Sequence, residues 1–311
     1  FHSIIWPAIL MALDVPLPKK VYGHGWLLLG SDKISKSKGN IVDPVELSAR
    51  YGVDAVRYFL LREVPFGNDG MYTNHALLSR INSDLANDLG NLVKRTVAMI
   101  SQYREGVIPQ LSDIEDIDKD VIRNAEAMLS DITVNMDALL VPEALQRIWS
   151  LIQRCNKYID ETTPWLLIKD TTKSARLDTV LYVLAESIRF VSVALTPFLP
   201  STAASILKQL GQVEVDCFDT IKTFGYIKDN SKVNPEKPLF PRIDIQKELV
   251  EMEKRAEELS ACSNATKEES KQKPQISIED FAKINLKVGV IKAAEKMPKA
   301  DKLLILKVDI A

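Results

Sequence analysis

Residues 85–100, LANDLGNLVKRTVAMI, carry the clearest structural signal in the sequence. The apolar side chains of this stretch recur every three or four residues, which is the period of one buried stripe along an α-helix. The stripe consists of Leu85, Leu89, Leu92, Val93, Val97 and Ile100. Helical periodicity extends from about residue 75 to 210, in further stretches at about 120–140, 142–160, 164–170 and 176–196. Several helices with short connections predict a helix bundle, so the expected fold class is mainly α.

Two short helices are expected before the bundle. Asp43-Pro44 predicts a helix start, because aspartate caps a helix and proline fits its first position. That helix should end near Tyr51-Gly52, and a second should run from Asp54 to Arg62. We interpret Asp54 as a helix cap rather than a catalytic acid. Closer to the N-terminus, residues 3–13 (SIIWPAILMAL) predict a buried helix.

The sequence changes character after the bundle. Residues 200–241 are mixed and rich in turn residues, and 243–260 predict a charged helix. Residues 261–275 have the composition of a flexible linker. From residue 276 to 311 apolar and polar residues alternate, which predicts a small β-domain.

The composition is that of an ordinary soluble globular protein of about two domains, with 311 residues, 46% apolar and 26% charged. The net charge of -2 excludes a uniformly basic nucleic-acid coat but allows local basic patches. Cys155, Cys217 and Cys262 lie far apart, so neither a disulfide framework nor a cysteine zinc site is supported. We expect a reducing, cytosolic setting, with no membrane span or signal peptide.

One short segment carries an unusual charge pattern. Residues 30–40, GSDKISKSKGN, place Lys33, Lys36 and Lys38 in a glycine-bounded loop after the apolar run Trp26 to Leu29. Flexible lysines can follow phosphate oxygens and offset the negative charge that develops during phosphoryl or nucleotidyl transfer. By composition alone, a solvated basic turn is the more common explanation. The ordered spacing K-I-S-K-S, followed by Asp-Pro and a short helix, is more specific than a simple run of charge.

Lys33 to Ser37 resemble the K-M-S-K-S signature of class I aminoacyl-tRNA synthetases, with Ile34 in place of methionine. The resemblance implies that Lys36, assisted by Lys33, stabilises the pyrophosphate leaving group of ATP during amino-acid activation. It also implies that Ser35 and Ser37 bind ATP, which enters with Mg²⁺. His24-Gly25 resemble the segment that lies against the adenosine.

Residues 1–12, FHSIIWPAILMA, resemble the segment that lines the methionine pocket in the methionyl-tRNA synthetase family. The resemblance implies that Phe1, His2 and Trp6 contact the methionine side chain. Aromatic rings suit this role, because a thioether sulfur gains from contact with them. Without the resemblance, Trp6 is as easily explained as a core residue.

Two places in the bundle resemble the anticodon-reading motifs of the same family. Asn91 and Arg95 are four residues apart and so share one helix face, while Trp165 follows Pro164 at a fresh helix start. The residues alone favour a solvated polar face and a core tryptophan. The resemblance implies that Asn91 and Arg95 hydrogen-bond anticodon bases and that Trp165 stacks on one, as is typical of RNA-loop recognition.

The resemblance implies that the chain consists of four parts. Residues 1–72 would be the end of a Rossmann-like α/β catalytic domain with its connecting helices, and 73–241 the helical anticodon-binding domain. Residues 242–275 would be a charged helix and linker. Residues 276–311 resemble the start of a β-barrel (OB-fold) tRNA-binding domain, through which the family also forms homodimers. Its Lys296, Lys299 and Lys302 would contact phosphates.

The implied activity is that of a methionine–tRNA ligase, with ATP, methionine and methionine tRNA as partners in the cytoplasm. The chain begins without methionine and ends within an apolar, strand-like run, so we expect a fragment. The remaining ATP-binding motif, and zinc if present, would lie upstream, and the fragment alone should be inactive. Two alternatives stay open: another class I synthetase for a large apolar amino acid, or a non-catalytic tRNA-binding module.

Overall fold

The computed structural model describes residues 1–29, 32–33, 42–212, 217–228, 230–255, 277–285, 288–296 and 304–310. The chain forms two compact units, Phe1–Lys254 and Arg255–Ala311, which are described separately. The helices of the first unit are α1 (Ile5–Ala12), α2 (Pro44–Tyr51), α3 (Val53–Glu63), α4 (Asn74–Arg80), the π-helix η2 (Ile81–Gly90), α5 (Asn91–Tyr103), α6 (Asp116–Asp137), α7 (Val141–Thr162), α8 (Pro164–Leu167), α9 (Ser174–Leu195) and α10 (Pro200–Gln209), with short 3-10 turns η3 (Thr171–Lys173) and η4 (Phe218–Ile221).

A small sheet precedes the bundle. Its strands β1 (Leu27–Leu29), β2 (Asp32–Lys33) and β3 (Gly70–Tyr72) lie in the order β2-β1-β3. Strand β1 is antiparallel to β2 and parallel to β3. Strand β1 forms within the apolar run Trp26 to Leu29 that precedes the lysine loop. The pairing with β3 had no signal in the sequence, because it joins distant segments.

Helix α1 forms where expected, but the prediction that it is buried is wrong. None of its residues is buried, and Ile4, Met11 and Leu13 at and around it expose 65–71% of their surface. An apolar helix is buried only where another element covers it, and no described element does so here.

Helices α2 and α3 confirm the sequence signals. The Asp43 carboxylate accepts a hydrogen bond from the Val45 N–H, and Pro44 occupies the first helical position. Gly52 separates the two helices with a positive φ of 88°, a conformation that glycine adopts without steric cost.

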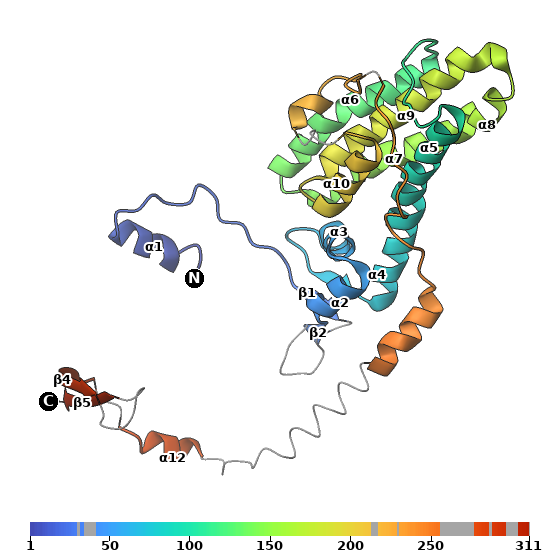
Figure 1. Ribbon diagram of the computed structural model, residues 1–311. Helices are drawn as coiled ribbons and strands as arrows, with labels where there is room; N and C mark the ends of the chain where they lie inside the picture. The colour runs from blue at the N-terminus through green and yellow to red at the C-terminus, as the bar shows by residue number, and fades with distance from the viewer. Residues whose placement is uncertain are drawn as a thin grey trace. The chain divides into compact units, whose positions relative to one another are not determined.

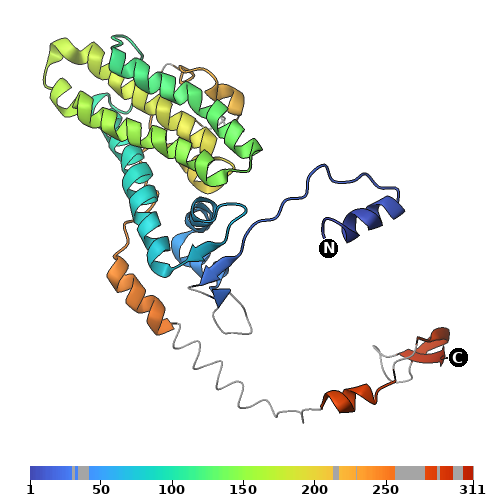
Figure 2. The ribbon, with the colours of Figure 1, turned by 180° about the vertical axis from the view of Figure 1, so that it is seen from behind.

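The bundle confirms the mainly helical fold (Figures 1 and 2). Helix α7 packs on α6 and α9, and α9 also packs on α10. The whole apolar stripe of residues 85–100 is buried in the core. Its first part, however, lies in the ten-residue π-helix η2, whose backbone bonds span five residues rather than four. Apolar spacing alone did not reveal this wider turn.

The segment after the bundle is more regular than expected. Residues 200–209 form helix α10, where the sequence predicted mixed structure. Residues 245–255, here called the return helix, confirm part of the predicted charged helix (Figure 1, orange). Residues 243–244 precede this helix, and residues 256–260 of that prediction, with the predicted linker 261–275, lie outside the described residues.

The second unit contains helix α12 (Ile278–Ala282) and strands β4 (Val290–Lys296) and β5 (Leu304–Asp309). The two strands pair antiparallel with a register shift between Ile291 and Ala293. This confirms the strand pattern of the tail. The barrel that the resemblance implies stays a prediction.

Candidate nucleotide and tRNA sites

The segment that leads into β1 is fixed by the loop before β3. The Trp26 N–H donates to the Asp69 carboxylate at 2.6 Å, and the Gly70 N–H donates to the Trp26 carbonyl at 2.8 Å. A Cβ on Gly25 would lie 1.9 Å from the Asn68 carbonyl oxygen, so only glycine fits there. Gly25 thus has a packing role in addition to its predicted place against adenosine.

His24 lies beside Gly25 on the surface. Its Nδ1 is 2.8 Å from the Gly25 carbonyl oxygen, and its ring packs edge-on against Phe66 with centroids 6.4 Å apart. These contacts hold the imidazole next to the start of β1, whose far end leads to the lysine motif.

Of the lysine motif, residues 30–40, the structure describes only Asp32 and the first lysine, Lys33. The backbone of Lys33 lies in β2 and pairs with Leu28. Lys33 was expected in the loop and is instead part of a short strand, because β1 offers it an antiparallel partner. Ser35, Lys36 and Ser37 lie outside the described residues.

The three predicted methionine contacts lie at the start of α1. Phe1 is 92% exposed and Trp6 46%, and His2 is also exposed. Their predicted role in a pocket stays a prediction. The Phe1 carbonyl accepts hydrogen bonds from backbone N–H groups at the start of α1, so this residue also stabilises the beginning of the helix.

The predicted anticodon residues lie on the bundle surface. Asn91 is the first residue of α5 and is exposed. Arg95 follows one turn later, and its Nη2 lies 2.9 Å from Oδ1 of Asp160 near the end of α7. No motif in the sequence marked Asp160, although it precedes the Pro164-Trp165 turn by only a few residues.

Trp165 is not a core residue, because 40% of its surface is exposed. Thr163, with a left-handed φ of 45°, breaks the chain between α7 and α8, and Pro164 then starts α8. Leu166 and Ile168 beside it are also exposed. A partly exposed indole at a helix start can accept a stacked base.

Polar contacts fix α7 against η2 below this surface. Gln153 and Asn156 donate to the side chain and the carbonyl of Asp88, at 3.0 and 3.1 Å. Burial raises the pKa of Asp88, although its bond to Gln153 acts in the opposite direction. These contacts hold the face of α7 that carries Asp160 next to the start of α5.

A buried charge cluster fixes the other side of α7. Both oxygens of Asp118 accept hydrogen bonds from Arg176, at 2.8 and 2.9 Å, and Oδ1 also accepts from the Tyr158 hydroxyl. Burial raises the pKa of Tyr158, so its hydroxyl stays protonated and donates. The cluster joins α6, α7 and α9 and makes the end of α7 a rigid support.

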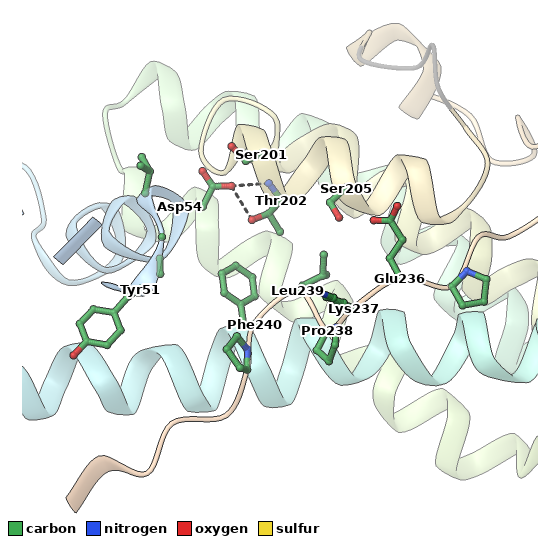
Figure 3. Close-up of a pocket in the computed structure, with 15 residues that line it drawn as sticks. Tyr51, Asp54, Ser201, Thr202, Ser205, Glu236, Lys237, Pro238, Leu239 and Phe240 are labelled. Carbon is green, nitrogen blue, oxygen red and sulfur yellow. Dashed lines mark hydrogen bonds between the residues drawn. The ribbon is translucent and has the colours of Figure 1, made fainter. Parts of the chain in front are cut away.

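A cavity of about 1060 Å³ lies where the two short helices meet the bundle (Figure 3). The start of α3, helix α10 and residues 235–241 line it. Here Asp54 caps α10 rather than its own helix: its Oδ2 accepts from the Thr202 N–H at 2.6 Å and from the Thr202 hydroxyl at 2.7 Å. Arg57 donates to the carbonyls of Pro197 and Phe198, so α3 holds the start of α10 from both sides.

None of the predicted site residues that the structure describes lines this cavity. In the part of the chain that the structure describes, no group of three or more His, Cys, Asp or Glu side chains could hold a metal ion. None of the described helices has the length and apolarity needed to cross a bilayer.

Comparison with known proteins identifies both halves of the first unit. Residues 1–97 match the family model of class I tRNA synthetases (M), and residues 108–258 match the anticodon binding domain of methionyl tRNA ligase. The methionine–tRNA ligase of Caldanaerobacter subterraneus subsp. tengcongensis is 53% identical over 100% of this chain and 48% of its own length. That of Bacillus subtilis is 45% identical, with the same coverage of each chain. The chain spans about half the length of the curated relatives it matches.

A solved structure supports the same assignment. Mycobacterium tuberculosis methionyl-tRNA synthetase in complex with methionyl-adenylate matches with a TM-score of 0.74 and 39% identity, over 78% of this chain and 48% of that one. The alternative of a class I synthetase for another amino acid is therefore not supported. The chain belongs to the methionyl-tRNA synthetase family of class I aminoacyl-tRNA synthetases.

Proposed function

We propose that this chain is the part of a methionine–tRNA ligase that joins ATP chemistry to anticodon reading. The observation that carries the proposal is its match over its full length to methionine–tRNA ligases. Because those relatives are about twice as long, the complete reaction belongs to the whole protein. In that reaction a methionine carboxylate oxygen attacks the α-phosphorus of ATP, and pyrophosphate leaves. A ribose hydroxyl of the tRNA then attacks the carbonyl carbon of the adenylate, and AMP and the hydroxyl proton leave.

The residues of the first part would act on ATP and methionine. Lys36, assisted by Lys33, would offset the charge that develops on the departing pyrophosphate, and no proton transfer is assigned to either. His24, Gly25, Ser35 and Ser37 would bind ATP, and Phe1, His2 and Trp6 would contact methionine. Mg²⁺ would enter with the triphosphate and neutralise part of its charge.

The bundle would read the anticodon. Asn91, Arg95 and Trp165 are all accessible, and they include the three kinds of group that bind splayed RNA bases: an amide, a guanidinium and an aromatic ring. The ion pair between Arg95 and Asp160 supports an ordered guanidinium at this surface.

The tail would begin an OB-fold that binds tRNA and forms a homodimer. The antiparallel pair of β4 and β5 supports this, since such barrels are built from short antiparallel strands. A cytoplasmic location fits this role in protein synthesis.

Binding to methionine tRNA at one fixed salt concentration tests the proposal. We expect this chain to bind it more tightly than the same tRNA with a changed anticodon, and Trp165→Ala to abolish the preference. Trp26→Ala is the matched control, because it removes another exposed tryptophan, 60% accessible, from outside the bundle. Equal binding of both tRNAs would contradict anticodon reading. ATP–pyrophosphate exchange by a full-length protein that carries this chain tests the alternative of a non-catalytic module.

A further inference from the structure

The chain returns to α2 after it leaves the bundle. Asn82 of η2 holds the backbone just before the return helix from both sides: its Nδ2 donates to the Ile243 carbonyl at 2.8 Å, and its Oδ1 accepts from the Ile243 N–H at 2.9 Å. Asp244 then caps the return helix by accepting from the Lys247 N–H at 3.2 Å. The direction of the return helix is therefore fixed where it begins.

Glu248 joins this helix to α2. Its Oε1 accepts a hydrogen bond of 2.5 Å from the Tyr51 hydroxyl and forms an ion pair with Nε of Arg50. The same arginine reaches Oε2 of Glu251 with Nη2, at 2.8 Å. The Tyr51 hydroxyl also lies 3.5 Å from the Met252 sulfur. One carboxylate thus holds two adjacent donors at the end of α2, about 200 residues earlier in the chain.

The contact is partly shielded from water. The side chains of Arg50 and Glu248 are only 18% and 17% exposed. Burial, together with the bond to Glu248, raises the pKa of Tyr51, so the phenol remains protonated and donates at neutral pH. Ion pairs in such surroundings are screened by salt less than those on an open surface.

The contact with the return helix adds polar anchors to α2, which otherwise packs on α3 and against the core through Leu47 and Tyr51. Only Leu47 among its eight residues is buried. In sequence, α2 begins four residues after Asn40, the last residue of the lysine motif. Helix α2 is thus the first helix that follows the lysine motif along the chain.

We propose that Glu248 is a positioning residue, which locks the return helix onto α2, the first helix after the lysine motif, and that ATP activation depends on this lock. This inference rests on the proposed function. It gives the segment after the anticodon bundle a role in the chemical step.

Amide hydrogen exchange of this chain tests the lock itself. We expect Glu248→Ala to speed exchange in residues 44–51 several-fold, with the core of α9 unchanged. Tyr51→Phe should give a smaller increase, because it removes one donor and keeps the Arg50 ion pair. The matched control is Glu253→Gln, on the exposed side of the same helix. Unchanged exchange in α2 of a folded Glu248→Ala variant would overturn the lock.

Steady-state kinetics of a full-length protein that carries this chain test whether the lock supports ATP activation. We expect Glu248→Ala to lower kcat/KM for ATP in pyrophosphate exchange several-fold and Glu248→Gln to lower it less, since the amide oxygen can still accept from Tyr51. The anticodon preference in tRNA binding should not change. A folded Glu248→Ala variant with unaltered ATP kinetics would overturn the positioning role. Absence of ATP–pyrophosphate exchange in the unsubstituted protein would instead contradict the proposed function. Amide hydrogen exchange in α2 would still test the lock.

Discussion

The guanidinium of Arg95 on α5 and the carboxylate of Asp160 on α7 lie 2.9 Å apart, with 39% and 66% of their side chains exposed. The pair orients a cation at the surface proposed to bind the anticodon, yet it also places a negative charge there. An RNA ligand must displace or tolerate that carboxylate. We therefore expect Asp160 to penalise phosphates, and bases that offer it no hydrogen-bond donor, which would be a source of selectivity.

We predict that Asp160→Asn tightens binding to tRNA several-fold and reduces the preference for the native anticodon. Removal of the carboxylate frees Arg95 and lowers repulsion of RNA phosphates, so the salt dependence of binding should also steepen. Binding curves for the native and the altered tRNA at several salt concentrations measure both effects. Asp137→Asn, at another exposed position of the bundle, should change neither.

The stability of the bundle should barely respond to Asp160→Asn, since exposed ion pairs contribute only about 0.2–1 kcal/mol to the free energy of unfolding. A large loss of stability would show that Asp160 is structural, and the change in selectivity would then need another explanation.

We predict that Gly25→Ala disrupts the pairing of β1 with β3. The new Cβ would lie 1.9 Å from the Asn68 carbonyl oxygen and 2.6 Å from the Asp69 nitrogen, and backbone atoms cannot move aside cheaply. Gly23→Ala is the control, because a Cβ there meets nothing within 4 Å. Amide exchange at residues 27–29 and 70–72 should accelerate in the first variant only. Equal protection in both variants would contradict the close approach.

The fold was predictable where its signals are local. The stripe of Leu85 to Ile100 and the Asp43-Pro44 cap depend on residues within a few turns of one another. The parallel pairing of β1 and β3 was not predictable, because it depends on contacts such as that of Trp26 with Asp69, 43 residues away. The exposed face of α1 also escaped prediction, because an apolar pattern does not reveal what covers it.

The candidate site was likewise predictable where its signals are local and not where they depend on long-range packing. Asn91, Arg95 and Trp165 were found by their motifs, and the structure shows that they are accessible. Asp160 was missed because its partner is 65 residues distant and is determined by how α5 packs on α7. Asp54 was expected to cap a helix, but the helix it caps is α10, 148 residues away.

We predict that Asp118→Asn strongly destabilises the bundle. Asp118 is fully buried and balances the charge of Arg176, which is only 7% exposed. Removing one member of a buried pair typically costs about 3–5 kcal/mol in the free energy of unfolding. Arg176 keeps an ion pair with Glu115 at 3.1 Å, but that side chain is 57% exposed and should compensate only in part. Urea unfolding measures the change. Asp116→Asn removes the same group from a pair whose aspartate side chain is 97% exposed, and it should cost little. Similar small losses in both variants would contradict a structural role for the buried pair.

The last prediction concerns alkaline pH and Cys155, which is fully buried in α7. Burial raises the pKa of its thiol to about 12 from an ordinary value of 9.0. In the unfolded chain the thiol loses its proton first, so the stability it contributes is fully present below pH 9 and is lost as the pH rises towards 12.

The free energy of unfolding should therefore fall between pH 9 and 12, and it should fall less steeply in Cys155→Ala. Buried tyrosines such as Tyr158, whose pKa is also raised, add to the decline in both proteins, so the difference between the two slopes isolates the thiol. Alkylation followed by peptide mapping gives an independent measure. Exposed Cys217 should react in the native protein, whereas Cys155 should react only after unfolding. Rapid alkylation of Cys155 in the native protein at pH 8 would show that α7 opens readily, and the support it gives to Asp160 would then be weaker than its contacts indicate.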